Sequence, residues 1–209
     1  MSKTIATQIA EVAVNTKFEN LPEEAVVKAK TLTLDVLASM LGTRDVISST
    51  IAREVAEELG GPAEATIVGS KDKVAAPNAA FANAIQCYGL DFVDDHNESN
   101  AHPSPATFPA SMALSEMLHR SGKEYIEAVS LGNEVVCRMG TAYLGDMYYQ
   151  GFHPTSTCGT MGAAVSAAKL MKLDEQKTIY AQGIAGSMVA GLMAWNPEGS
   201  FTKRLQAGH

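Results

Sequence analysis

The chain has 209 residues, of which 46% are hydrophobic and 19% charged, and its 16 Lys and Arg against 23 Asp and Glu give a formal net charge of −7. This apolar content is enough to build a core and excludes intrinsic disorder. The acidic balance argues against a nucleic-acid binder, because such proteins displace counterions from phosphates with a net positive face.

The sequence predicts a soluble, cytoplasmic protein that neither binds nor crosses membranes. Cys87, Cys137 and Cys158 lie in apolar, helix-like stretches without the C-x-x-C spacing of a zinc site, as in proteins of a reducing compartment. The first 20 residues lack the apolar core of a signal peptide. The uncharged segment 178–197 is too polar for a lipid-facing helix, so we expect it to be buried on all sides by protein.

Helical periodicity dominates from the N-terminus onward. An amphipathic helix begins near Ile5, a second runs from Pro22 to Gly42, and a third follows Ser48 and ends at Gly60. One short strand is predicted at 65–68. Five long helices then follow, at about 77–90, 104–119, 123–143, 156–171 and 175–195.

The last two of these helices are rich in Ala and Gly, so we expect them to be central and fully surrounded. No repeat, linker or low-complexity tract marks a domain boundary. We therefore predict an all-α fold, a mostly helical bundle with at most one short β-hairpin, forming a single domain over residues 1–209.

Two breaks between the long helices share one construction. In each, a histidine precedes a proline and a small hydroxyl residue at a helix start: His102 before Ser104, and His153 before Thr155. Helix N-termini favour anions, and a histidine there can deliver or accept a proton. Two such ends facing one cavity would hold a substrate with several carboxylates, although the same pattern also serves as plain helix capping.

Charged residues around these breaks add candidate chemistry. Asp91, Asp94 and Asp95 cluster before the first break, and mutual repulsion would keep one carboxyl basic enough to accept a proton. Lys203 could supply a fixed positive charge. A metal site built from Asp91, Asp94, His96, His102 and His153 is a weaker alternative, because no two histidines have the i, i+4 spacing of strong metal motifs.

Three stretches of the chain resemble the MmgE/PrpD family, which contains 2-methylcitrate dehydratase, cis-aconitate decarboxylase and iminodisuccinate epimerase. They are GLDFVDDHNESNAHPS at 89–104, GFHPTSTCGTMGAAVSAAKLMKLDEQ at 151–176, and IAGSMVAGLMAWNPEGSFTKRLQAGH at 184–209. Weaker likeness extends over the N-terminal helices. Three motifs in the right order make the resemblance specific for the family, though not for one reaction within it.

The resemblance implies a homodimeric enzyme that acts on small di- and tricarboxylates without a metal or organic cofactor. It places Asp91, His102, His153 and Lys203 on active-site positions. His96 falls where the decarboxylase branch has threonine, which argues against decarboxylation. Family chains continue past the Lys-Arg-Leu segment at 203–205 into further helices and a second α+β domain. We therefore expect this chain to be an N-terminal portion, with the C-terminal part of the site supplied by a partner chain or by the rest of a longer protein.

We therefore expect a lyase, a dehydratase or decarboxylase, that works by acid–base chemistry next to a carboxylate. Asp91 or His102 would remove the proton, and His153 or His102 would return one. An epimerase using the same groups and a non-catalytic dimerisation or partner module are the alternatives. The residues expected to contact substrate are His96, Asp95, Ser104, Thr155 and Lys203.

Overall fold

The computed structural model describes residues 3–209 as a mostly helical protein with one two-stranded antiparallel hairpin. Its elements are α1 (Ile5–Asn15), η1 (Phe18–Asn20), α2 (Glu23–Thr43), α3 (Ile47–Leu59), β1 (Ala65–Thr66), β2 (Lys73–Val74), α4 (Ala76–Cys87), η2 (Asn97–Ser99), α5 (Ser104–Met117), α6 (Gly122–Ala142), α7 (Asp146–Tyr149), α8 (Pro154–Leu170), α9 (Glu175–Met188), α10 (Trp195–Glu198) and α11 (Thr202–Gly208). The all-α prediction with a short hairpin is confirmed.

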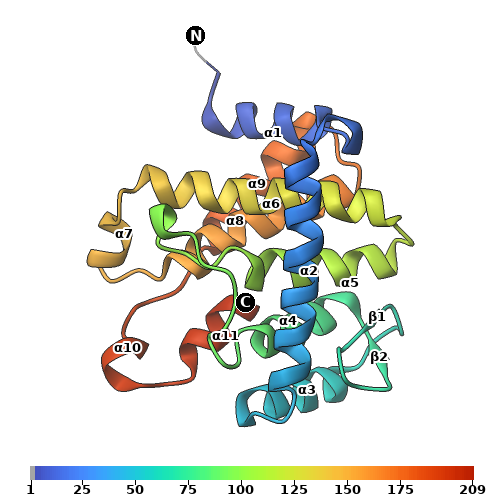
Figure 1. Ribbon diagram of the computed structural model, residues 1–209, viewed down its shortest axis with the longest axis vertical. Coiled ribbons are helices and arrows are strands. Elements are labelled where there is room, and N and C mark those ends of the chain that lie inside the picture. Colours follow the sequence, from blue (N-terminus) through green and yellow to red (C-terminus); the bar gives the residue numbers. More distant parts are fainter. Residues whose placement is uncertain (1–2) are drawn as a thin grey trace.

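Helices α4, α5, α8 and α6 pack side by side in that order, and the long helix α2 crosses in front of them (Figure 1). The main core lies where α2 meets this layer, around Val36, Met40, Phe108 and Val129. A second cluster under the hairpin, including Ile67, packs against α4. The short C-terminal helix α11 folds back onto α4, so the end of the chain returns to the middle of the molecule.

Helix α8 is central, as its small residues predict. It contacts α6 so closely that a Cβ atom added to Gly132 would lie 2.0 Å from Ser166 Oγ. A Cβ on Gly162 would likewise lie 2.6 Å from the Gly132 carbonyl oxygen. Only glycine allows this approach of the two backbones, so the α6–α8 contact depends on both positions.

The prediction for the second small-residue helix is wrong in length and in burial. The helix expected over 175–195 ends at Met188, and its outer face leaves Tyr180 61% and Ile184 67% exposed. Gly191 has φ of +124° and accepts a hydrogen bond from the His153 N–H, which turns residues 189–194 into a loop over the start of α8. The uncharged segment 178–197 is therefore only partly buried by neighbouring parts of the chain.

Within residues 3–209, no helix is both long enough and apolar enough to cross a membrane.

Candidate active site

The candidate site forms where the loop after α4 meets the first turn of α8. Tyr88 caps α4 by donating its N–H to the Ala84 carbonyl, and Asp91 then turns the chain with φ of +57°. This left-handed conformation is uncommon for residues other than glycine, although Asp tolerates it better than most. The His102 N–H donates to Thr155 Oγ1 over 2.9 Å, which ties the loop to α8.

Lys203, on α11, supplies the cation of the site. Its Nζ lies 2.5 Å from Asp91 Oδ2, 5.0 Å from the centroid of the Tyr88 ring and 4.7 Å from that of Trp195. Aromatic ring faces attract a cation, so these contacts hold the ammonium group in addition to its ion pair. The Lys203 side chain is 18% exposed and that of Asp91 is 49% exposed. The ion pair is thus accessible from solvent, mainly at the Asp91 carboxylate.

The His102 ring is fixed by the backbone of its own loop. Its Nδ1 lies 2.9 Å from the Asp94 carbonyl oxygen, and because a carbonyl can only accept, Nδ1 carries the proton. In the neutral ring, Nε2 therefore carries the lone pair, 3.9 Å from Asp91 Oδ1. Asp95 Oδ1 lies 3.7 Å from Nδ1 on the other edge. His102 thus presents its proton-accepting nitrogen to the Asp91 carboxylate.

The second imidazole, His153, is the N-cap residue of α8 and is only 4% exposed. Its Nδ1 lies 2.8 Å from Gln206 Oε1. Burial lowers the pKa of His153 from about 6.5 to about 4; the Gln206 hydrogen bond opposes this shift, and the charges of Lys203 and His102 add to it. The ring is therefore neutral near pH 7, a state suited to accepting a proton.

The Tyr88 ring lies between these groups. It meets His102 edge to face at 5.3 Å between centroids and lies parallel to His153 at 6.2 Å. Tyr88 is 1% exposed, and its hydroxyl has no hydrogen-bond partner among residues 3–209. Burial, and then the charge of Asp91, raise the pKa of Tyr88, so the hydroxyl stays protonated and can act only as a neutral donor or acceptor.

The structure brings together six of the eight residues proposed from the sequence. They come from the loop after α4, from the beginning of α8 and from α11, and they are Asp91, Asp95, His102, His153, Thr155 and Lys203. Their convergence places one cation, two carboxylates and two imidazoles around one aromatic ring.

The side chains of the other two residues proposed to contact substrate, His96 and Ser104, have partners outside the cluster, although the Ser104 N–H donates to the Asp94 carboxylate over 3.3 Å. His96 caps the short turn η2, where Nδ1 lies 3.0 Å from Ser99 Oγ and Nε2 lies 3.6 Å from Glu98. Ser104 is fully buried at the start of α5 and accepts a hydrogen bond from Asn133 Nδ2 of α6 over 3.2 Å. Local capping and interhelical packing account for both side chains.

Three residues of the cluster were not proposed from the sequence: Tyr88, Trp195 and Gln206. Tyr88 lies three residues before Asp91, and Trp195 is the one tryptophan of the chain, but each fits an ordinary apolar helix equally well. The Trp195 Nε1 is buried without a hydrogen-bond partner in the described part of the chain. Nothing in the local sequence marks Gln206, because its role depends on a residue 53 positions away.

The cluster reaches the molecular surface through Asp91 and Asp95, whose side chains are about half exposed. Two cavities border it, one of about 260 Å³ lined by Ser156 and Gln206 and one of about 350 Å³ lined by Asp94 and Asp95, whereas a larger cavity of about 580 Å³ lies away from it, between α1 and α6. In the part of the chain that the structure describes, no group of three or more His, Cys, Asp or Glu side chains is arranged to hold a metal ion. The side chains at this face supply a fixed cation, carboxylates and two imidazoles.

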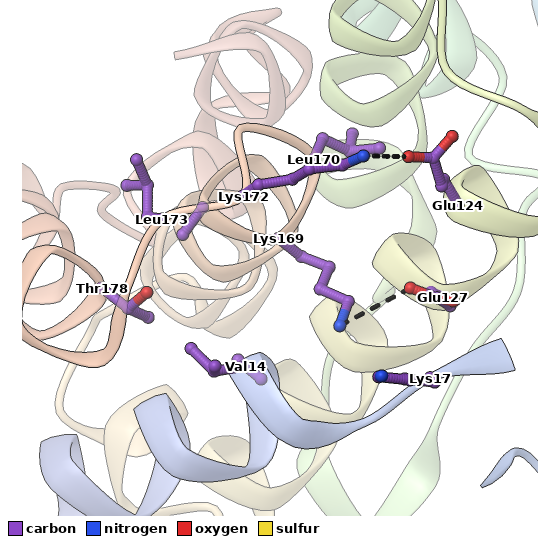
Figure 2. A pocket seen from close by; sticks show the side chains of 11 residues that line it. Val14, Lys17, Glu124, Glu127, Lys169, Leu170, Lys172, Leu173 and Thr178 are labelled. Carbon is purple, nitrogen blue, oxygen red and sulfur yellow. Dashed lines mark ion pairs between the residues drawn. The ribbon is translucent and has the colours of Figure 1, made fainter.

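A second group of lysines and carboxylates lines a cavity of about 340 Å³ between α8 and α6 (Figure 2). Lys169 pairs with Glu127 at 3.5 Å, and Lys172 pairs with Glu124 at 3.0 Å. The Lys169 ammonium also donates to the Thr16 carbonyl, and the Phe18 N–H donates to Glu127. We refer to Lys169, Glu127, Thr16 and Phe18 as the Lys169 junction, because their bonds fasten the segment after α1 to α6 and α8.

The family model and similar curated proteins point to the same family. The MmgE/PrpD N-terminal domain matches residues 7–209. The cis-aconitate decarboxylase of Homo sapiens is 32% identical, covering 100% of this chain and 44% of the human protein. The cis-aconitate decarboxylase of Aspergillus terreus is 28% identical, with 98% and 43% covered, and that of Mus musculus is 30% identical, with 100% and 43% covered.

The chain therefore spans less than half the length of these relatives, and the helices from α2 onward all fall within the region that the family model matches. The stretches at 89–104, 151–176 and 184–209 that indicated a resemblance supply the residues that meet around Tyr88. The match over residues 7–209 shows that the chain belongs to the MmgE/PrpD family, of which it carries the N-terminal domain.

Proposed function

We propose that this chain carries the acid–base part of a lyase that acts next to a carboxylate of a small di- or tricarboxylate. The observation that carries the proposal is the Lys203–Asp91 ion pair, which reaches the surface at Asp91. Beside it lie two imidazoles whose Nδ1 atoms already form hydrogen bonds within the protein. The names of the decarboxylase relatives support a tricarboxylate substrate.

Each group has a distinct task in such a reaction. The Lys203 ammonium would hold a substrate carboxylate and stabilise the negative charge that develops when the neighbouring carbon loses a proton or a carboxyl group. A neutral imidazole accepts a proton through Nε2, and general acid–base help of this kind contributes about 10²–10⁴-fold in rate. Asp91 sets the position of Lys203 and balances its charge.

The two lyase reactions differ in what these residues must supply. Loss of CO₂ leaves a carbanion that needs a proton delivered to carbon, whereas loss of water requires a base that removes one. Burial keeps His153 neutral near pH 7, and His96 stands where the resemblance places a threonine in the decarboxylase branch. Both observations favour loss of water from a hydroxytricarboxylate, while the names of the relatives favour loss of CO₂ from cis-aconitate.

The test is to supply the full gene product that contains this chain with cis-aconitate and, separately, with citrate and 2-methylcitrate. We expect an unsaturated product from a hydroxytricarboxylate, with CO₂ release from cis-aconitate as the competing outcome. Asp91→Asn and His102→Ala should each abolish turnover while the helical circular dichroism stays unchanged. Full activity in both folded variants, or solvent proton exchange without loss of water or CO₂, would overturn the lyase proposal.

A further inference from the structure

The side-chain amide of Gln206 is oriented by two neighbours of different chemistry. Its Nε2 donates to the Leu192 carbonyl oxygen over 3.1 Å, and its Oε1 lies 2.8 Å from His153 Nδ1. Because a carbonyl oxygen only accepts, the NH₂ group must face Leu192, and the amide oxygen is left to face His153. The orientation of the amide thus follows from its partners.

An amide oxygen cannot donate, so the proton of the hydrogen bond must belong to His153 Nδ1. We propose that Gln206 is a positioning residue that holds His153 in its Nδ1–H tautomer, leaving Nε2 to accept a proton in the reaction. The chemical step rests on the proposed function, whereas the tautomer itself does not. This proton-accepting role comes in addition to the proton-returning role expected for His153 from the sequence.

Contacts with α8 and α4 fix the helix that carries Gln206. Ser156 Oγ donates to the Gln206 carbonyl over 2.9 Å and lies 2.8 Å from the Ala190 carbonyl. A Cβ added to Gly208 would lie 2.8 Å from the Ile85 side chain, so α11 packs closely on α4. The loop that carries Leu192 and the helix that carries Gln206 are therefore both anchored at the first turn of α8.

His102 follows the same rule with a different partner, the Asp94 carbonyl, which also leaves the lone pair on Nε2. The charged and titratable groups that act on His153 are Lys203 and His102, which lower its pKa, and Asp91, which raises it. The site therefore presents two imidazoles in the same tautomer beside one ammonium group. Because burial keeps the His153 ring neutral near pH 7, this ring is suited to removing a proton.

The proposed step balances within the residues present. The C–H bond next to a substrate carboxylate breaks, its electron pair stays on carbon and spreads into the carboxylate beside Lys203, and the proton goes to His153 Nε2. The resulting imidazolium keeps its Nδ1–H bond to Gln206. When the C–O bond breaks, the electron pair on carbon forms the C=C bond, and the departing hydroxyl takes the proton from His153 Nε2 and leaves as water, which restores the neutral ring.

Histidine-selective ¹⁵N NMR of the protein reports the tautomer without any substrate. We expect the Nδ1–H form for His153 at pH 7 in the wild type and a population of the Nε2–H form in Gln206→Leu. Gln206→Glu should keep the Nδ1–H form, because a carboxylate also accepts, and should raise the pKa of His153. Gln182→Leu is the matched control, since Gln182 is a buried glutamine on α9 that bonds Ala6 and Thr178 instead.

Turnover of the full gene product gives the second readout. Gln206→Leu should lower kcat by at least about 10-fold with little change in KM, toward the ~10⁴-fold that loss of the correct histidine tautomer costs in serine proteases. Gln206→Glu should restore part of kcat and move the acid limb of the pH–rate profile to higher pH.

A wild-type His153 in the Nε2–H or imidazolium form at pH 7, or the same tautomer in Gln206→Leu as in the wild type, would overturn the positioning role. If the tautomers are as expected but no carboxylate is turned over, the lyase proposal fails and the role of Gln206 stands. If turnover occurs with the wrong tautomer, the lyase proposal stands and the role of Gln206 fails.

Discussion

Two lysine–carboxylate pairs in this protein show how the same groups serve different ends. In the Lys169 junction, Lys169 and Glu127 form an ion pair (Figure 2), and their side chains are 13% and 14% exposed. Each also forms a hydrogen bond with a backbone group of the segment after α1. In the candidate site, the Lys203 ammonium contacts two aromatic faces besides the Asp91 carboxylate, and Asp91 is 49% exposed. The hydrogen bonds to backbone give the first pair a structural role, whereas the exposed carboxylate of the second pair leaves room for a ligand.

Removing the site lysine should have the largest effect, and it should fall on activity. Lys203→Met takes away the cation that would stabilise the developing charge, so kcat/KM should fall by about 10³-fold, as when a main electrostatic donor is deleted. The free energy of unfolding should change by less than about 1 kcal/mol, because the remaining Asp91 carboxylate is reached by water. Steady-state kinetics and urea unfolding measure both quantities.

If Lys203→Met lowered the free energy of unfolding as strongly as it lowered the activation free-energy advantage measured by kcat/KM, the distinction between the two pairs would disappear.

Lys169→Met is the matched change in the junction and should act on stability instead. It leaves Glu127 buried without its cation and the Thr16 carbonyl without its donor, so we expect a loss of about 3 kcal/mol in the free energy of unfolding. The folded fraction should keep wild-type kcat. In a double-mutant cycle, adding Glu127→Leu should recover part of the loss, and purely additive costs would show that the pair is not coupled.

The pH dependence of stability should separate the two regions as well. His153 takes a proton near pH 6.5 when unfolded but only near pH 4 when folded, so between these values the unfolded state binds more protons. Stability is therefore fully present above pH 6.5 and should fall by about 2–3 kcal/mol as the pH drops toward 4. His153→Gln should flatten this part of the curve.

The control for the pH experiment is His119→Asn, because His119 is exposed and has φ of +52°, a conformation that Asn tolerates. This variant should keep the wild-type pH dependence. A curve that is equally steep in His153→Gln and in the wild type would mean that another group titrates.

The smallest predicted effect concerns the aromatic contacts of Lys203. Trp195→Leu removes one ring face from the ammonium group, and a cation–π contact of this exposure contributes about 0.5–1 kcal/mol. We expect carboxylate binding to weaken by about 2- to 5-fold, as measured by calorimetric titration. No change would show that the ion pair with Asp91 alone positions the lysine.

Local signals predicted much of this fold. Helix α8 begins at Pro154 and helix α5 begins at Ser104, close to the starts expected from the two histidine–proline breaks, because proline suits a first helical turn. The predicted end of the last long helix is wrong, because an uncharged run of residues does not reveal that the chain leaves the helix and turns at Gly191. Burial of α9 depends on neighbours that the local sequence does not contain.

The site was less accessible from sequence than the fold. Asp91 and Lys203 are 112 positions apart, so no spacing rule connects them, and the resemblance to the family was needed to place both in one site. The network that decides which nitrogen of His153 carries a proton involves Gln206 and Leu192, whose side-chain and backbone roles exist only after folding. The sequence does not mark Tyr88 as a site residue, because an aromatic residue at a helix end is usually part of the core.

The central claim is that Asp91, His102, His153 and Lys203 form one binding site for a small carboxylate. The most direct measurement is a titration of the histidine-labelled protein with cis-aconitate, followed by the ¹⁵N resonances of its imidazoles. The claim predicts that His102 and His153 shift together with one Kd, that His119 stays unchanged, and that both shifts disappear in Lys203→Met. Shifts confined to His119, or shifts of His102 and His153 that persist in Lys203→Met, would contradict it.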